Sequence, residues 1–144
     1  MKKTTLLLPM LFIFGVLALT SCGTFGNSDL LSGTTWKLSS FGSISNPTAA
    51  LPNINSSLVF GKDGRMNGNV GCNSFGGDYK VSADQITFGP VLRTMMACQG
   101  PVMQQEDAVM LVFSGTAKYT VDSGKLMITS TNGETVVTFT QAGK

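Results

Sequence analysis

The sequence contains no histidine, and this absence excludes several common kinds of chemistry. Ser-His-Asp triads and Cys-His pairs use an imidazole as the general base, and the common zinc sites use it as a ligand. Charged residues are also scarce, at 12% of the chain against about 25% in an average domain. We therefore expect no metal site and no cofactor, and a surface made mainly of uncharged polar residues.

The chain also lacks any cluster of basic residues. Ten Lys and Arg stand against eight Asp and Glu, and Lys2 and Lys3 account for the whole excess. The other basic residues are dispersed singly, whereas nucleic-acid binding needs clustered cations that displace counterions from phosphates. We therefore expect no nucleic acid among the partners.

The longest apolar run, Leu6–Leu19, lies directly after the basic N-terminus. This layout is typical of a secretory signal peptide. A transmembrane anchor is the alternative, but the run is shorter than the roughly 20 residues that a spanning helix needs. Residues 1–21 are therefore predicted to be a signal peptide, and the protein to be exported.

The end of this signal, Leu19-Thr20-Ser21-Cys22, resembles the bacterial lipobox. The resemblance implies cleavage before Cys22 and acylation of its thiol and new amino group, which would anchor the chain durably in a lipid bilayer. A free cysteine beside an ordinary cleavage site is the alternative. Gly23 follows the cysteine, and in an enterobacterial-type cell this sequence directs a lipoprotein to the outer membrane, facing the periplasm. Residues 22–29 are predicted to be a short lipid-anchored tether.

From residue 30 to residue 144 the sequence alternates between short strand-like runs and turn residues. Strands are predicted at residues 35–41, 57–60, 65–72, 78–81, 85–88, 118–121, 125–131 and 135–140. Turns are predicted at Asp63-Gly64, Gly76-Gly77 and Asn132-Gly133, and a loop at residues 43–56. Short hairpin links require antiparallel pairing, and a sheet of about eight strands closes to protect its edges. We predict a mainly β domain, a small and strongly bent antiparallel barrel-like sheet with one packed α-helix.

That helix is predicted to begin at Pro101 and to end at Ser114-Gly115. Its apolar face, which includes Val102 and Val109, is expected to pack at one open side or end of the barrel. Glu106 falls on the same face and is a candidate for partial burial. A charge near the helix N-terminus, stabilised by the helix dipole, is the commoner explanation for a carboxylate at this place.

Cys72 and Cys98 are the two cysteines that remain if Cys22 carries lipid. Two thiols in an exported domain usually pair, and closing this loop should stabilise the fold by about 3–4 kcal/mol. Two buried free thiols are the alternative. A redox-active pair is less favoured, because such pairs are usually arranged as Cys-x-x-Cys.

Three methionines, Met95, Met96 and Met103, lie around Cys98. Clustered methionines can line an adaptable binding surface, although filling the core is their commoner role. Both interpretations stay open from the residues alone.

Taken together, these segments resemble the META domain family, also called HslJ-like. The resemblance runs from about Leu30 to Phe139 and rests on these pieces: Gly33–Leu38, Gly71–Tyr79, Thr94–Cys98, Glu106 and Leu126–Ile128. It implies a small, mainly β, barrel-like fold with a helix, similar to the cracked barrel of a type III secretion pilotin lipoprotein. The resemblance also implies a bacterial lipoprotein, as many members are, with links to stress and antibiotic tolerance and, in distant eukaryotic members, to virulence and secretion. The family has no established catalytic residues, so none are carried over, and Asn73 and Glu106 are predicted only as candidate binding or structural residues.

The function expected from these features is that of a non-enzymatic, membrane-anchored envelope lipoprotein. Its partners would be the bilayer, through acylated Cys22, and an unknown envelope protein or apolar ligand. It would support envelope integrity, stress or antibiotic tolerance, or secretion. The alternatives are an inhibitor of envelope proteases that uses residues 43–56, and a histidine-independent hydrolase that uses Glu106 or Asp78.

Overall fold

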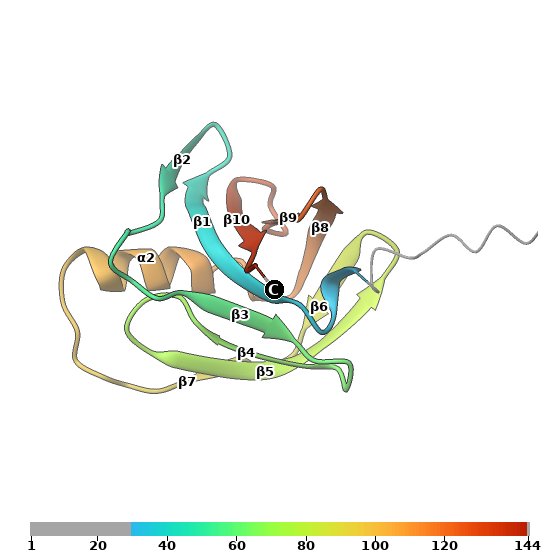
Figure 1. Cartoon of the computed structure of the whole chain (residues 1–144), viewed down its shortest axis with the longest axis horizontal. Helices are drawn as coiled ribbons and strands as arrows, with labels where there is room; N and C mark the ends of the chain where they lie inside the picture. The colour runs from blue at the N-terminus through green and yellow to red at the C-terminus, as the bar shows by residue number, and fades with distance from the viewer. Residues whose placement is uncertain (1–29, 144) are drawn as a thin grey trace, which may run out of the picture.

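A closed antiparallel β-barrel dominates the computed structural model, which describes residues 30–143 (Figure 1). The predicted signal peptide, Cys22 and the tether up to residue 29 lie outside the described residues. The barrel strands are β1 (Thr35–Ser43), β3 (Ser57–Phe60), β4 (Arg65–Asn69), β5 (Ser74–Ser82), β6 (Gln85–Phe88), β8 (Thr116–Asp122), β9 (Lys125–Thr129) and β10 (Thr135–Gln141). They pair in this order, and the ring closes because β10 pairs with β1 as well as with β9. The predicted mainly β, barrel-like fold of about eight strands is confirmed.

Two further strands, β2 (Asn46–Ala49) and β7 (Leu92–Arg93), lie outside this ring. β2 pairs with β1 alone, and β7 pairs with β5 alone. The prediction of a plain loop at residues 43–56 is wrong for five residues, because Ser43 ends β1 and the four residues of β2 lie within this range. Pro47 is compatible with a strand here because β2 is an edge, where a missing N–H breaks no ladder bond.

The glycine pair Gly76-Gly77 lies inside β5, so the prediction of a turn there is wrong. The chain reverses instead at residues 70–73, because β4 ends earlier than predicted. A Cβ atom at Gly77 would lie only 2.9 Å from the carbonyl oxygen of Pro90. Glycine is required here by the close approach of another segment and not by a turn.

Large apolar side chains fill the interior of the barrel. Inward residues alternate with outward ones along the strands, as on any pleated strand with one buried face. Those with no more than 1% exposure include Trp36, Leu58, Phe60, Ile86, Tyr119, Leu126, Ile128 and Phe139. The interior is therefore a packed core, and binding to this barrel would use its surface or its ends.

Helix α2 (Pro101–Met110) is the one helix that lies wholly within residues 30–143. It begins at the predicted residue but ends four residues before Ser114, so the predicted end is wrong. The N–H of Phe113 donates to the Met110 carbonyl three residues back, which tightens the turn and ends the helix. Phe113 then packs against Phe75 and Phe88 of the barrel, with ring centroids 5.4 and 5.2 Å away.

The helix lies at the left of the barrel in Figure 1, and the segment from β7 curves around that end to reach it. Val109 faces the barrel with no exposed surface, as the apolar periodicity predicted. Within the described part of the chain, no helix is long and apolar enough to cross a membrane.

Candidate functional site

The predicted pairing of Cys72 and Cys98 is confirmed, since the two residues form a disulfide bond with Cα atoms 6.2 Å apart. Cys72 lies in the turn between β4 and β5, and Cys98 lies three residues before α2. We call residues 92–98 the strap, because they run from β7 toward the helix along one end of the barrel. The disulfide fastens the end of the strap to the turn at residues 70–73.

Glu106 lies at the centre of a buried polar network and is only 1% exposed. Its Oε2 atom accepts hydrogen bonds from the main-chain N–H groups of Cys72 at 2.8 Å and Asn73 at 2.6 Å. Its Oε1 atom accepts from the Asn73 amide at 2.9 Å and from Arg93 Nη1 at 3.1 Å. The predicted partial burial is an underestimate, and the helix-dipole explanation is wrong, because these tertiary contacts and not the helix end hold the carboxylate.

Asn73 extends this network to the strap. The residue is 2% exposed, and its Oδ1 atom accepts hydrogen bonds from the Thr94 hydroxyl at 2.9 Å and the Met96 N–H at 2.7 Å. With the disulfide, these bonds hold the strap at three points. Asn73, predicted as a binding or structural residue, therefore has a structural role in the described residues.

Gly71 and Gln105 complete the contact between α2 and the turn. A Cβ atom at Gly71 would lie 2.6 Å from Glu106 Cβ, so only glycine allows the helix to approach this closely. Gln105 has no exposed surface, donates to the Val70 carbonyl at 2.5 Å and accepts from the Leu51 N–H at 2.8 Å. Sequence reasoning missed Gln105, although its place between the apolar helix positions and beside Glu106 was a usable signal.

Arg93 is a second residue that the sequence analysis missed. Its Nη1 atom lies 3.1 Å from Glu106 and 2.8 Å from Asp107, and its side chain is 40% exposed. The hydrogen bond to Asp107 raises the pKa of Arg93 above its already high ordinary value, so the guanidinium stays charged. This cation offsets the charge of the buried Glu106 carboxylate.

The methionines of the strap point outward, so core filling is the wrong explanation for two of them. Met95 is 95% exposed and Met96 is 54% exposed, while Met103 on α2 is half-buried. Leu92 is also 77% exposed. Polar and main-chain contacts fasten the strap, so these apolar side chains are left facing solvent.

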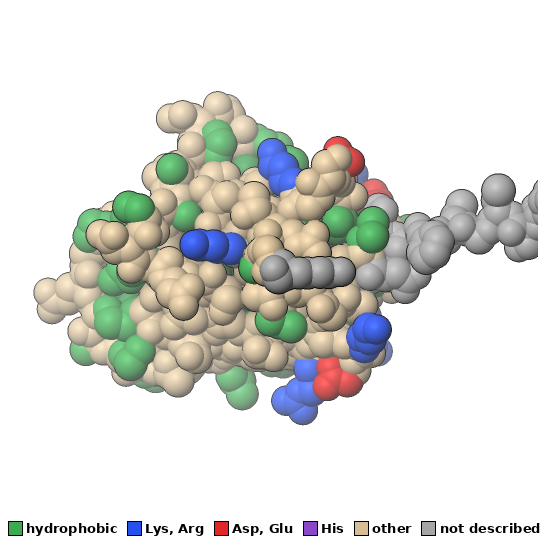
Figure 2. Space-filling view, viewed as in Figure 1, with side chains coloured by type: hydrophobic (Ala, Val, Ile, Leu, Met, Phe, Trp, Pro, Cys, Tyr) green, Lys and Arg blue, Asp and Glu red, His purple; other side chains and the backbone are tan. Residues whose placement is uncertain are grey.

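On the face shown in Figure 2, hydrophobic side chains gather at the left end of the molecule. Figure 1 places the strap and the start of α2 at that end. Lys, Arg, Asp and Glu are absent from the left end in this view and lie elsewhere on the face. Contiguous exposed apolar surface of this kind is typical of interaction sites.

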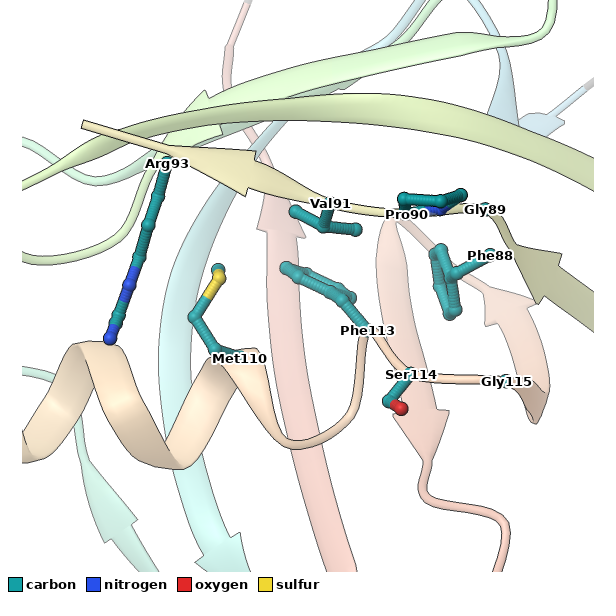
Figure 3. A pocket seen from close by; sticks show the side chains of 9 residues that line it. All are labelled: Phe88, Gly89, Pro90, Val91, Arg93, Met110, Phe113, Ser114 and Gly115. Atoms are coloured by element: carbon teal, nitrogen blue, oxygen red, sulfur yellow. The ribbon is translucent and has the colours of Figure 1, made fainter.

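A surface pocket of about 470 Å³ lies behind the strap, between residues 88–93 and 110–115. Figure 3 shows Val91, Met110 and Phe113 pointing into the space between β7 and α2. Arg93 spans the same space and reaches the helix. The pocket is therefore apolar at its floor, with a single paired cation at one side.

The disulfide and the hydrogen bonds of Asn73 hold the strap against the turn at residues 70–73. Both oxygens of Glu106 already accept hydrogen bonds from protein groups, and Asp78 is an exposed residue of β5. No group of three or more potential metal-ligating His, Cys, Asp or Glu side chains occurs among residues 30–143. That the protein is not an enzyme stays a prediction.

The fold and this cluster define a small eight-stranded β-barrel protein, capped by a helix and carrying a disulfide-fastened strap. The META domain family model matches residues 29–143, and the chain belongs to the META domain family. The resemblance seen in the sequence is therefore confirmed. No curated protein matches the chain.

Two of the solved structures with the same fold come from named bacteria. A protein from Burkholderia xenovorans, solved by NMR, has a TM-score of 0.67 at 23% identity, over 81% of this chain and 87% of that one. A DUF4847 family protein from Bacteroides vulgatus ATCC 8482, solved by crystallography, has a TM-score of 0.59 at 13% identity, over 83% of this chain and 99% of that one. At these identities the likeness establishes the fold alone.

Proposed function

We propose that the protein is a membrane-anchored envelope lipoprotein that binds a protein partner through the strap. In this way it would support envelope integrity, stress or antibiotic tolerance, or secretion. The observation that carries the proposal is the exposure of Leu92, Met95 and Met96 on a segment whose main chain is fastened. A binding surface fixed before the partner arrives loses little conformational entropy on binding, which favours affinity.

The place of the strap supports a protein partner over the bilayer. In Figure 1 the described chain begins, in blue, at the right of the molecule, whereas the strap reaches α2 at the left. A short tether that ends at residue 29 would attach the right end to the membrane. The strap would then face away from the anchoring bilayer, where an envelope protein can reach it.

Photo-crosslinking in cells tests this proposal. A photoreactive amino acid replaces Met95 in the full-length protein, and we expect a covalent adduct with a discrete protein on illumination. Thr120, exposed on β8, is the matched control position and should give no adduct. No protein adduct from Met95, or equal adducts from both positions, would contradict the proposal.

A second candidate, an inhibitor of envelope proteases, is favoured by the β1–β2 hairpin. All four residues of β2 are exposed, and the hairpin projects at the top of Figure 1. The segment that follows β2 is held by a hydrogen bond from the Leu51 N–H to Gln105. Ile44, at the tip of the hairpin, is 53% exposed. Exposed segments that move little on binding suit protease inhibition. The wild-type protein should then inhibit purified envelope proteases, and Ile44→Ala should weaken that inhibition. Full protease activity in the presence of the wild-type protein would exclude this function.

A further inference from the structure

The barrel opens along one line, at the pocket of Figure 3. β6 and β8 pair at residues 85–87 and 116–118, and the Phe88 N–H still donates to the Gly115 carbonyl at 2.8 Å. Beyond this bond the two segments of the chain separate. Residues 89–93 continue along β5, whereas residues 110–115 lead back to α2, and the pocket occupies the gap between them.

One wall of this gap is the free edge of β7. β7 pairs with β5 alone, with Arg93 opposite Phe75, and the next residue, Thr94, donates its N–H to the Ser74 carbonyl at 3.0 Å. Main-chain groups alternate in direction along an antiparallel ladder, so the N–H and C=O of Arg93 point away from β5. Apart from any bond within the β5–β7 ladder, neither the N–H nor the C=O of Arg93 takes part in a hydrogen bond among residues 30–143. An unpaired strand edge is a template for another strand.

The remaining walls indicate what kind of chain would fit. Met110 and Phe113 give an apolar floor, which suits an apolar side chain. Arg93 is the one cation that lines the gap, and it is paired with both Glu106 and Asp107. The local charge is therefore negative, and the Asp107 side chain stays 59% exposed. This balance disfavours fatty-acid carboxylates and lipid phosphates and favours a neutral or basic ligand.

We propose that the partner of the proposed function inserts an extended polypeptide segment along the free edge of β7. Its main chain pairs with the N–H and C=O of Arg93, one apolar side chain covers Met110 and Phe113, and a Lys or Arg lies near Asp107. Strand addition takes affinity from main-chain hydrogen bonds and specificity from side-chain pockets. A lipid chain has no donor or acceptor for this edge, so the geometry selects a peptide.

The test starts from a phage-displayed library of random decapeptides, selected on the full-length protein in mild detergent. We expect enriched peptides with an apolar residue near a Lys or Arg, and the synthetic peptide is titrated by fluorescence anisotropy. Arg93→Pro removes the main-chain N–H at the free edge, where proline is tolerated in a strand. Arg93→Ala is the matched control, because it loses the same ion pairs and keeps the N–H. The proline variant should bind at least tenfold more weakly than the alanine variant.

A second measurement uses the unaltered protein, so it does not depend on how either variant folds. Single N-methyl groups are placed along the peptide in turn. Because only alternate N–H groups of an added strand face β7, we expect affinity to fall at the one position whose N–H donates to the Arg93 carbonyl and to be retained at the two adjacent positions. Equal affinity for the two Arg93 variants, a uniform response to N-methylation, or no enriched peptide would each overturn the proposal. Displacement of the peptide by oleate micelles, or self-association of the chain through this edge, would overturn it too.

These outcomes are separable from those of the proposed function. Crosslinking at Met95 without an enriched peptide would retain the strap as a binding surface and overturn strand addition. A peptide that passes both measurements, in a protein with no crosslink at Met95, would support strand addition at β7 and overturn the role of the strap.

Discussion

At the scale of single residues, the energetic cost of burying a polar group in the core depends on whether that group has a hydrogen-bond partner. Glu106 has four hydrogen-bond donors around its two oxygens, whereas the hydroxyl of Tyr119 has none among the described residues. A buried polar group is costly unless it is paired, so the two side chains should respond to substitution in opposite directions.

Glu106→Gln tests the first case. The substitution keeps the shape of the side chain, but it removes the negative charge and turns an NH₂ group toward atoms that are already donors. We expect the free energy of unfolding in urea to fall by about 3 kcal/mol. Asp107→Asn is the control, because this neighbouring carboxylate is exposed and should cost less than about 1 kcal/mol. Equal losses for the two variants would show that the network does not hold the fold.

Tyr119→Phe tests the second case. The side chain is 1% exposed and its hydroxyl is unpaired, so removing the hydroxyl should raise the free energy of unfolding by about 1 kcal/mol. Tyr79→Phe is the control with the opposite sign, since the Tyr79 hydroxyl donates to the Gly61 carbonyl at 2.7 Å. A loss of stability in Tyr119→Phe as large as in Tyr79→Phe would contradict this account.

The same residue predicts a pH dependence. Burial, with smaller contributions from Asp84 and Tyr79, raises the pKa of Tyr119 above its usual value. A pKa that is higher in the folded state means that the neutral form is favoured there. The resulting stability is present below the unfolded pKa of about 10 and is lost as pH rises through the folded pKa. The wild type should therefore lose more stability than Tyr119→Phe in denaturation curves taken above that pH, and identical alkaline slopes would contradict the prediction.

At the scale of elements, the strap depends on two kinds of fastening that act at different points. The disulfide holds its end at Cys98, and Asn73 holds Thr94 and Met96. Sequence reasoning found the disulfide, because two cysteines in a domain that is predicted to be exported have few other uses. It could not find the hydrogen bonds of Asn73, because a single asparagine in a turn has many possible partners.

Replacing both Cys72 and Cys98 with alanine should lower the free energy of unfolding by about 3–4 kcal/mol, since the unfolded chain regains the entropy of the open loop. The strap should become more mobile near residue 98 and stay held near Thr94 and Met96, where amide hydrogen exchange gives the measurement. Wild-type protein under reducing conditions is the control and should behave like the double variant. Unchanged stability, or immediate alkylation of the wild type without reductant, would contradict the prediction.

At the scale of the whole molecule, the barrel closes on itself within residues 30–143, because β10 returns to pair with β1. The predicted anchor at Cys22 lies before this closed unit. Membrane attachment and folding should therefore be independent properties, and a change at the anchor should leave the barrel unchanged.

Cys22→Ser tests this independence in cells. Metabolic labelling with a fatty acid should mark the wild type and not the variant, and the variant should leave the membrane fraction. Its thermal unfolding should match that of the wild type, because the pairing of β10 with β1 closes the barrel within residues 30–143. An unlabelled wild type would refute the lipid anchor, and an unfolded variant would refute the independence.

The sequence by itself determined the class of the fold, because alternating apolar residues and turn signals such as Asp63-Gly64 and Asn132-Gly133 act over a few neighbouring positions. It also determined the start of α2 and the pairing of the two cysteines. Only the tertiary structure decided that Gly77 serves a close approach, that Gln105 and Glu106 hold a distant turn, and that Met95 faces solvent. The physical reason is that these roles depend on contacts between segments far apart in the chain, which no local pattern records.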